Sequence, residues 1–505
     1  MHKRKWRVYY PILLGTYAAA WLVSVNISQM VLSAGIRTIL VTVLFSLGVY
    51  ALFSWRIKDE HKAALLCAWF MLFFFAYGHV YGVVEGMTIS GMVVGRHRFL
   101  FPVWLVIFGV VGWLIYRRAR KLEMFSRALN VVSIVLLVIP VIQIGVFEWQ
   151  RSNPVSNETS PAFFRPEVSS AVVNQLPDVY YIILDSYGRE DMLGKYYHLD
   201  ISEFIHQLED MGFYIASCSQ SNYGVTDFSL ASSLNMDYIQ NIAPPPVENQ
   251  SKWIPLGDLI RHSLVRRFFE EMGYKTVAFK SGVWWSEMQD ADYFFHGTSL
   301  GIEIPIYFWQ PNGFEILFLR TTALRVFLEA SNAWLGTFFV DSLKGHAQDI
   351  AYVLEELKKV PQIPDSKFVF LHLMAPHAPY VFSPEGIFSF TEDAEPGYPN
   401  EIKYLNMQIL QVVRTIIEES RVPPIIILQG DHGLDTEVRM AIFNAIYFPN
   451  GGDKVLYQTM SPINTFRLVL NTYFNQNFTL LPDISYFSAY GDYYDFSEVA
   501  YPCAP

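Results

Sequence analysis

Five apolar stretches fill most of the first 150 residues, and they constrain the fold more than any other feature of the chain. They are Tyr10–Leu32, Ile36–Trp55, Ala63–Val84, Phe99–Tyr116 and Leu129–Phe147. Each is close to the ~20 apolar residues that a helix needs to cross a bilayer. Only 17% of all residues are charged, whereas about 25% is usual in soluble proteins. The sequence therefore predicts a transmembrane domain of five helices over residues 1–150, and buried helices of a soluble core are the weaker alternative.

The basic residues predict how these helices are oriented, because cytoplasmic loops are enriched in Lys and Arg. Such residues precede the first stretch, at positions 2–7, and also lie at 56–62 and 117–121. Arg96 and Arg98 count modestly against this scheme. The first stretch is too long for a signal peptide and lacks a convincing cleavage site, so it is expected to remain. We therefore expect a multi-pass protein of the cell (plasma or inner) membrane, with a cytoplasmic N-terminus and everything after Phe147 extracytoplasmic.

The extracytoplasmic part is expected to begin with a linker at residues 151–177, which is rich in Ser, Pro and Asn. Residues 178–505 form the predicted catalytic domain. The net charge of −10 arises in this part, and nothing in it suggests a nucleic-acid surface. Cys218 and Cys503 both lie here, and the sequence leaves open whether they pair.

Short apolar strands alternate with helices in this second part. The expected strands are Val179–Leu184, Phe213–Ala216, Thr276–Phe279, Lys367–Leu373 and Ile425–Leu428, and the expected helices include Ser202–Met211, Asp227–Asp237 and Leu259–Met272. Fully apolar strands separated by helices indicate an α/β domain with a mainly parallel central sheet covered on both faces.

Polar residues follow three of these strands directly. Asp185 follows the first, His377 lies in the loop after Lys367–Leu373, and Asp431 and His432 follow Ile425–Leu428. Ligands of such sheets bind beyond the carboxyl ends of the strands, so these side chains are expected to converge. Two carboxylates and an imidazole suit one divalent metal ion, Zn²⁺ or Mn²⁺ before Mg²⁺.

Thr226 stands at the start of the expected helix Asp227–Asp237 and has two interpretations. As a helix N-cap it would contribute about 1 kcal/mol to stability. As a hydroxyl next to a metal ion and a helix N-terminus, it would be an activated nucleophile. The two interpretations are compatible.

Taken together, these residues resemble the alkaline phosphatase/sulfatase superfamily. The resemblance covers approximately residues 177–475. Its motifs are Asp185 after the first strand, the helix starting at Thr226, the loop Leu373–Tyr380, Asp431-His432-Gly433, and the segment Ser461–Asn471. With five membrane helices before the domain, the chain is most similar to the membrane-anchored branch of lipoteichoic acid synthases and phosphoethanolamine transferases.

The resemblance implies a metal held by Asp185, Thr226, Asp431 and His432, with Thr226 as nucleophile. His377 would face the substrate phosphate or protonate the leaving oxygen. The implied activity is metal-dependent transfer of a phosphoryl head group from a phospholipid or lipid-linked donor to a glycan or lipid acceptor. The alternatives are a sulfatase-like hydrolase or phosphodiesterase, and a non-catalytic lipid- or glycan-binding scaffold.

Several residues depart from the family patterns. The segment starting at Thr226 lacks the Cys, Pro and Arg of the sulfatase motif, and threonine cannot be converted to formylglycine, which argues against sulfatase activity. No histidine follows His432, so the second zinc site of alkaline phosphatases is expected to be incomplete and a single metal is predicted.

Weaker predictions concern three residues that would contact substrate, Asn222, Lys280 and Arg189. Asn222 has a turn role as its alternative, and Arg189 has pairing with Glu190 or Asp191. His372, inside an apolar strand, is expected to be a core residue. The aromatic segment Ile302–Leu317 is expected to fill a core, with contact to the membrane or a bound lipid or sugar as alternatives.

Overall fold

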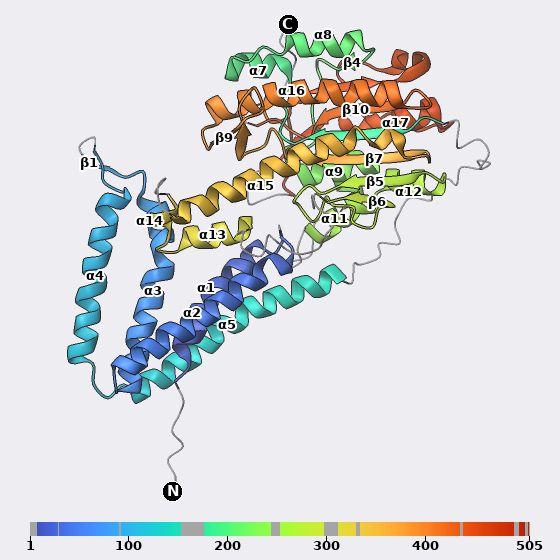
Figure 1. Ribbon diagram of the computed structural model, residues 1–505. Helices are drawn as coiled ribbons and strands as arrows, with labels where there is room; N and C mark the ends of the chain where they lie inside the picture. The colour runs from blue at the N-terminus through green and yellow to red at the C-terminus, as the bar shows by residue number, and fades with distance from the viewer. Residues whose placement is uncertain are drawn as a thin grey trace. The chain divides into compact units, whose positions relative to one another are not determined.

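The computed structural model describes residues 8–28, 30–89, 92–152, 176–243, 253–296, 312–329, 334–434, 438–488, 494–499 and 503. The chain forms two compact units (Figure 1). The first contains Met1–Asn153 and Glu303–Ser342, and the second contains Pro154–Ile302 and Leu343–Pro505.

Five helices make up most of the first unit. They are α1 (Tyr10–Asn26), α2 (Leu32–Arg56), α3 (Glu60–Val84), α4 (His97–Arg118) and α5 (Glu123–Ser152). The helices α2 to α5 are long and apolar enough to cross a membrane. Helix α1 has 17 residues and ends six residues before the predicted end, where Asn26 donates a hydrogen bond back to Leu22 O. Arg151 and Ser152 continue α5, so the helix extends into the predicted linker, most of which lies outside the described residues.

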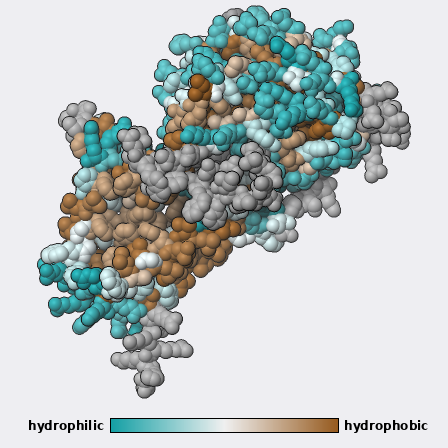
Figure 2. Space-filling model, viewed as in Figure 1, coloured by the Kyte–Doolittle hydropathy of each residue, from teal (hydrophilic) through white to brown (hydrophobic). Residues whose placement is uncertain are grey.

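The surface of these helices is that of a membrane protein. Helix α4 has no buried residue, and Leu44, Val106 and Val131 are exposed on α2, α4 and α5. Figure 2 shows hydrophobic side chains gathered over the helices of this unit. In water such a surface would be strongly unfavourable, whereas lipid matches it.

The segment 303–342 belongs to the first unit, although it lies far along the chain. Its described part contains α13 (Gly313–Thr321) and α14 (Arg325–Leu328). Phe318 of α13 packs in the same apolar cluster as Cys67, Met71 and Phe75 of α3. The expected catalytic domain of residues 178–505 is therefore interrupted. The core packing expected for 302–317 is seen for Phe314 and Ile316, which are buried, while residues 302–311 lie outside the described residues.

A seven-stranded sheet forms the centre of the second unit. Its strands are β3 (Val179–Leu184), β4 (Tyr214–Ile215), β5 (Lys275–Phe279), β6 (Tyr293–Phe295), β7 (Lys367–Leu373), β10 (Ile425–Gly430) and β11 (Asn444–Tyr447). The order is β4-β11-β10-β3-β7-β5-β6. The pairs β10–β3, β3–β7, β7–β5 and β5–β6 are parallel, and β11 is antiparallel to both neighbours. Every residue of β3, β7 and β10 is buried, so both faces are covered and the predicted α/β fold is confirmed.

Helices and short hairpins surround this sheet. The helices are α7 (Glu190–Tyr197), α8 (Ser202–Asp210), α9 (Thr226–Asn235), α10 (Ile239–Ile242), α11 (Trp253–Arg261), α12 (Leu264–Glu271), α15 (Trp334–Leu357), α16 (Ala394–Glu419) and α17 (Pro462–Tyr473). One hairpin pairs β8 (Tyr380–Phe382) with β9 (Phe388–Thr391), and the other pairs β12 (Ser485–Phe487) with β13 (Ser497–Val499). Helix α15 begins within the stretch assigned to the first unit. The single helix expected over 259–272 is wrong, because Ser263 caps a new helix by accepting a hydrogen bond from Arg266 N. Cys218 and Cys503 form a disulfide with Cα atoms 5.3 Å apart.

Candidate active site

The carboxyl ends of two neighbouring strands, β3 and β10, bring three possible metal ligands together. Asp185 follows β3, and Asp431 and His432 follow β10, which is the parallel neighbour of β3. The possible ligand atoms of these three side chains all lie within 4.8 Å of one another, and all three side chains are buried. The side chains that were expected to converge because they follow the carboxyl ends of strands, Asp185, Asp431 and His432, are therefore close together in the fold.

Thr226 faces this group from the start of α9. The helix N-cap is Val225, and Thr226 is the first helical residue. The N-cap expected at Thr226 is therefore wrong. Its Oγ1 instead lies 3.1 Å from His432 Nε2. The hydroxyl is thus turned to the candidate site rather than to the orphan N–H groups of its own helix.

The hydrogen bonds around His432 determine which ring nitrogen carries the proton. Nδ1 lies 2.9 Å from Gly433 O, and since a carbonyl only accepts, Nδ1 donates. Burial lowers the pKa of His432, although the charge of Asp431 acts in the opposite direction. The neutral ring therefore presents the lone pair of Nε2 to the site, as metal ligation requires.

The carboxylates are held by a residue in an unusual backbone conformation. Ser186 has φ +67°, a conformation that is uncommon for residues other than glycine. In this conformation its N–H donates to Asp431 Oδ1 at 2.8 Å and its hydroxyl donates to Asp185 Oδ1 at 2.9 Å. Burial alone would raise the pKa of Asp185, but the hydrogen bond from His372 and the nearby imidazoles of His377 and His432 hold it below its usual value.

These residues fit a divalent metal ion. Asp431 Oδ2 is buried and has no hydrogen-bond partner among the described residues, which is costly unless a cation satisfies it. Two ligands of a tetrahedral ion with bonds near 2.0–2.1 Å lie about 3.3 Å apart. His432 Nε2 lies 3.1 Å from Thr226 Oγ1 and 3.4 Å from Asp431 Oδ2. The donor set of two carboxylates, one imidazole and one hydroxyl is also chemically suitable.

A second polar group lies near His377, which follows β7. The charge of His377 influences both Asp185 and His346 of α15. Lys280, which follows β5, donates to Asp349 Oδ2 at 3.0 Å, one helical turn after His346. Burial lowers the pKa of His346 to about 4, and its Nε2 has no partner among the described residues. His377 therefore lies close enough to Asp185 and His346 for its charge to act on both, while Lys280 contacts the same helix as His346 through Asp349.

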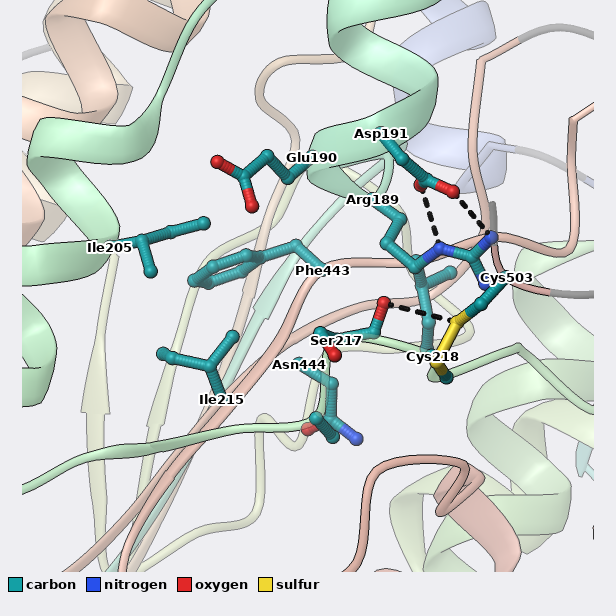
Figure 3. A pocket seen from close by; sticks show the side chains of 12 residues that line it. Arg189, Glu190, Asp191, Ile205, Ile215, Ser217, Cys218, Phe443, Asn444 and Cys503 are labelled. Atoms are coloured by element: carbon teal, nitrogen blue, oxygen red, sulfur yellow. Dashed lines mark hydrogen bonds and ion pairs between the residues drawn. A yellow bond between two sulfur atoms is a disulfide. The ribbon is translucent and has the colours of Figure 1, made fainter. Parts of the chain in front are cut away.

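Asn222 and Arg189 have other partners. Asn222 is buried, with Nδ2 donating to Ser461 Oγ and Ile484 O and Oδ1 accepting from Ile463 N, so its amide holds the start of α17. Arg189 makes two hydrogen bonds to Asp191. It lines a cavity of about 200 Å³ beside the disulfide (Figure 3), which none of the four candidate metal ligands lines. The pairing with Asp191 given as the alternative for Arg189 is present, whereas the side chain of Asn222 makes long-range contacts rather than the expected turn contacts.

Two residues near the ligands had no predicted role there. His372, as expected, is buried with both ring nitrogens in contact, but one contact is Asp185 Oδ2, at 3.1 Å from Nε2. Arg439 Nη2 lies 3.2 Å from His432 Nε2. His372 is the penultimate residue of β7, and its position beside the strand end was a usable signal that it could reach the site. Arg439 lies in a turn and carried no such signal.

Comparison with known proteins finds one matching family model and several similar solved structures. A family model described as Sulfatase matches residues 177–466. None of the curated proteins shows a significant match. Among solved structures, the integral membrane lipooligosaccharide phosphoethanolamine transferase A from Neisseria meningitidis has 13% identity and a TM-score of 0.39, and the match covers 92% of this chain and 94% of that one. The zinc complex of the periplasmic domain of EcEptC from Escherichia coli has 11% identity and a TM-score of 0.37, with coverage of 59% and 82%.

The family model extends over more than half of the chain and spans β3, α9, β7 and β10, which carry Asp185, Thr226, His377 and the Asp431–His432 pair. This chain belongs to the Sulfatase family.

Proposed function

We propose that the protein is a metal-dependent phosphoryl head-group transferase with Thr226 as its nucleophile. The observation that carries this proposal is the placement of the Thr226 hydroxyl, 3.1 Å from His432 Nε2 and without a capping role at its own helix. A hydroxyl that only stabilised α9 would accept from a backbone N–H of the first turn.

The ion would be held by Asp185, Asp431, His432 and Thr226. When bound, it would lower the pKa of the threonine hydroxyl and withdraw charge from the phosphate oxygens. Zn²⁺ or Mn²⁺ suits the mixed nitrogen and oxygen ligands better than Mg²⁺ does. Ser186 and His372 hold the carboxylates in place through the hydrogen bonds described above.

The reaction would proceed in two displacements at phosphorus. In the first, Thr226 Oγ1 would lose its proton to solvent and form a bond to phosphorus, the bond to the lipid oxygen would break, and that oxygen would take a proton from His377. In the second, an acceptor hydroxyl would give its proton to His377 and form the new bond to phosphorus, and Thr226 Oγ1 would leave and regain a proton from solvent. His377 suits the acid role because its Nδ1 is bound to Ala378 O at 2.6 Å, which leaves Nε2 for a substrate oxygen.

A lipid donor is favoured over a soluble one by the membrane helices of the same chain. Water in place of the acceptor hydroxyl would make the protein a phosphodiesterase, which is the second candidate function. A non-catalytic scaffold is disfavoured because the buried carboxylates, imidazole and hydroxyl are costly to maintain without a ligand.

The test is mass spectrometry of the zinc-loaded full-length protein after incubation with phospholipids carrying labelled head groups. We expect a head-group phosphate on residue 226 in the wild type and in Thr226→Ser, and none in Thr226→Ala. Turnover of Thr226→Ala should fall by about 10⁴-fold or more. Undiminished turnover of Thr226→Ala at equal metal content would refute the proposed mechanism.

A further inference from the structure

The side chain of Arg439 has a fixed position beside the candidate metal ligands. Its Nε donates to Gly224 O, and its Nη1 donates to Leu434 O at 3.4 Å. Gly224 lies two residues before Thr226, so the arginine links the nucleophile turn to the segment after β10. The third nitrogen, Nη2, lies 3.2 Å from His432 Nε2. Two of the three guanidinium nitrogens are therefore held by backbone carbonyls, and the third is directed into the site.

The charge of Arg439 is not neutralised by a direct ion pair with any of the described residues. Burial lowers its pKa, while the charges of Asp431 and Asp185 act in the opposite direction. Arg439 is partly buried, whereas Arg189 and Arg266 are buried and each pairs directly with a carboxylate. Arg439 thus provides a positive charge at the site that is available to an anion.

The chemistry requires such a charge. In phosphoryl transfer, negative charge is spread over the non-bridging oxygens of the transferred group, and cationic side chains or metal ions stabilise it. Among the described residues, only Asp185, Asp431 and His432 form a group suited to a metal. No histidine follows His432 that would complete a second metal site.

We infer that Arg439 binds a non-bridging oxygen of the substrate phosphate and supplies the second positive charge beside a single metal ion. The inference rests on the proposed function, because it assigns Arg439 to the same phosphate. The lone pair of His432 Nε2 cannot serve both a metal ion and an N–H of Arg439. With an ion bound to His432, Nη2 of Arg439 would no longer donate to that ring, and its N–H would be free to bind a phosphate oxygen. An arginine fixed at its other nitrogens is well suited to this role, since its donors keep their direction.

The test measures inorganic phosphate binding by calorimetry on the zinc-loaded full-length protein in detergent. Replacing a charged hydrogen-bond donor costs about 1.5–3 kcal/mol, so Arg439→Gln should weaken phosphate binding about tenfold or more. Arg439→Lys keeps the charge but loses the paired N–H donors of the guanidinium group. Its phosphate affinity should therefore lie between those of the wild type and Arg439→Gln. Zinc affinity, measured by competition with a chelating dye, should be unchanged or higher in Arg439→Gln, because the competing contact with His432 is gone.

Arg467 provides the matched control. It is a partly buried arginine of α17 that also donates to carbonyls, those of Met236 and Thr479, and its charge neighbours are Asp237 and Tyr238. Arg467→Gln should lower the unfolding temperature without changing phosphate affinity at equal zinc content. Phosphate binding by Arg439→Gln that equals the wild type, or loss of zinc from this variant, would overturn the inference. Weakened phosphate binding without a Thr226 adduct in the wild type would retain the anion site and reject the transferase.

Discussion

The candidate ligand Asp185 depends on His372 for one of its hydrogen bonds. His372 Nε2 donates to Asp185 Oδ2, and Nδ1 lies 3.0 Å from Ser286 Oγ. Partners of this kind orient a ligand and raise its affinity for metal. They also hold the carboxylate in its charged form, since the His372 hydrogen bond lowers the pKa of Asp185.

Replacing His372 should therefore weaken metal binding without removing a ligand. We expect His372→Leu to lower zinc affinity about 10- to 100-fold, as measured by competition with a chelating dye. His372→Gln, whose amide N–H can reach the same carboxylate, should retain most of the affinity. Equal zinc affinity in the leucine variant and the wild type would mean that His372 contributes only packing and does not support the metal site.

Three of the four candidate metal ligands were predictable from their position after strands, and Thr226 followed from the family resemblance, whereas the partners of Asn222 and Arg189 were not predictable. Asp185, Asp431 and His432 directly follow strands, and the geometry of a parallel sheet brings such residues together. Asn222 and Arg189 lie in loops, where a side chain can satisfy its hydrogen bonds locally. Arg189 does so with Asp191, whereas Asn222 bonds to Ser461, Ile463 and Ile484 far along the chain, and only the folded backbone reveals those partners.

At the scale of elements, the loop carrying His377 is supported by a buried carboxyl group. Glu401 of α16 accepts hydrogen bonds from the N–H groups of Val381 and Phe382 in β8, both at 3.0 Å. Burial raises the pKa of Glu401 to about 7, against the lowering effect of these two hydrogen bonds. At pH 5–6 the group is thus protonated in the folded protein and ionised in the unfolded chain.

This difference predicts how stability depends on pH. Folding takes up a proton between pH 4.5 and 7, so the contribution of Glu401 to stability falls as pH rises through this range and then levels off. The total loss is at most about 3 kcal/mol. The unfolding temperature of Glu401→Gln should not show this fall with pH. Glu385→Gln, at an exposed residue, serves as the control and should keep the fall. A difference in unfolding temperature between the wild type and Glu401→Gln that stays constant from pH 4.5 to 8 would contradict the expectation.

Regular elements were predicted well where burial alone decides them. The bounds of β3 and β7 agree with the expected apolar runs. The expected helix over 259–272 was not correct, because its apolar spacing continues across His262 and Ser263 while Ser263 caps a new helix. A serine side chain that bonds to a nearby backbone N–H can start a new helix at that position. The spacing of apolar residues does not reveal such a break.

At the scale of the whole molecule, the segment with α13 and α14 forms hydrogen bonds and an ion pair with one end each of three membrane helices. Asn312 donates to Ala34 O just after the start of α2, Arg325 donates to Glu85 at the end of α3, and Glu329 contacts His97 at the start of α4. Consecutive helices that cross a bilayer place these three ends on one side. The predicted topology gives that side as extracytoplasmic, as it does for everything after α5.

No apolar pattern indicated that this segment returns to the first unit. Its docking depends on close approach at one position, since a Cβ on Gly78 of α3 would lie 2.0 Å from Arg320 O. It also depends on the Arg37–Glu315 ion pair, which joins residues 278 positions apart. Such long-range complementarity is a property of the assembled helices rather than of any local window of sequence.

The predicted orientation can be tested with two single cysteines. Met87, after α3, is 53% exposed, and Met124, at the start of α5, is 83% exposed. The native cysteines give little background, because Cys67 is buried and Cys218 is bonded to Cys503. In intact cells, a membrane-impermeant maleimide should label Met87→Cys, and it should label Met124→Cys only after permeabilisation. Labelling of Met124→Cys in intact cells, with Met87→Cys protected, would invert the topology and place the Thr226 site in the cytoplasm, out of reach of acceptors on the outer face.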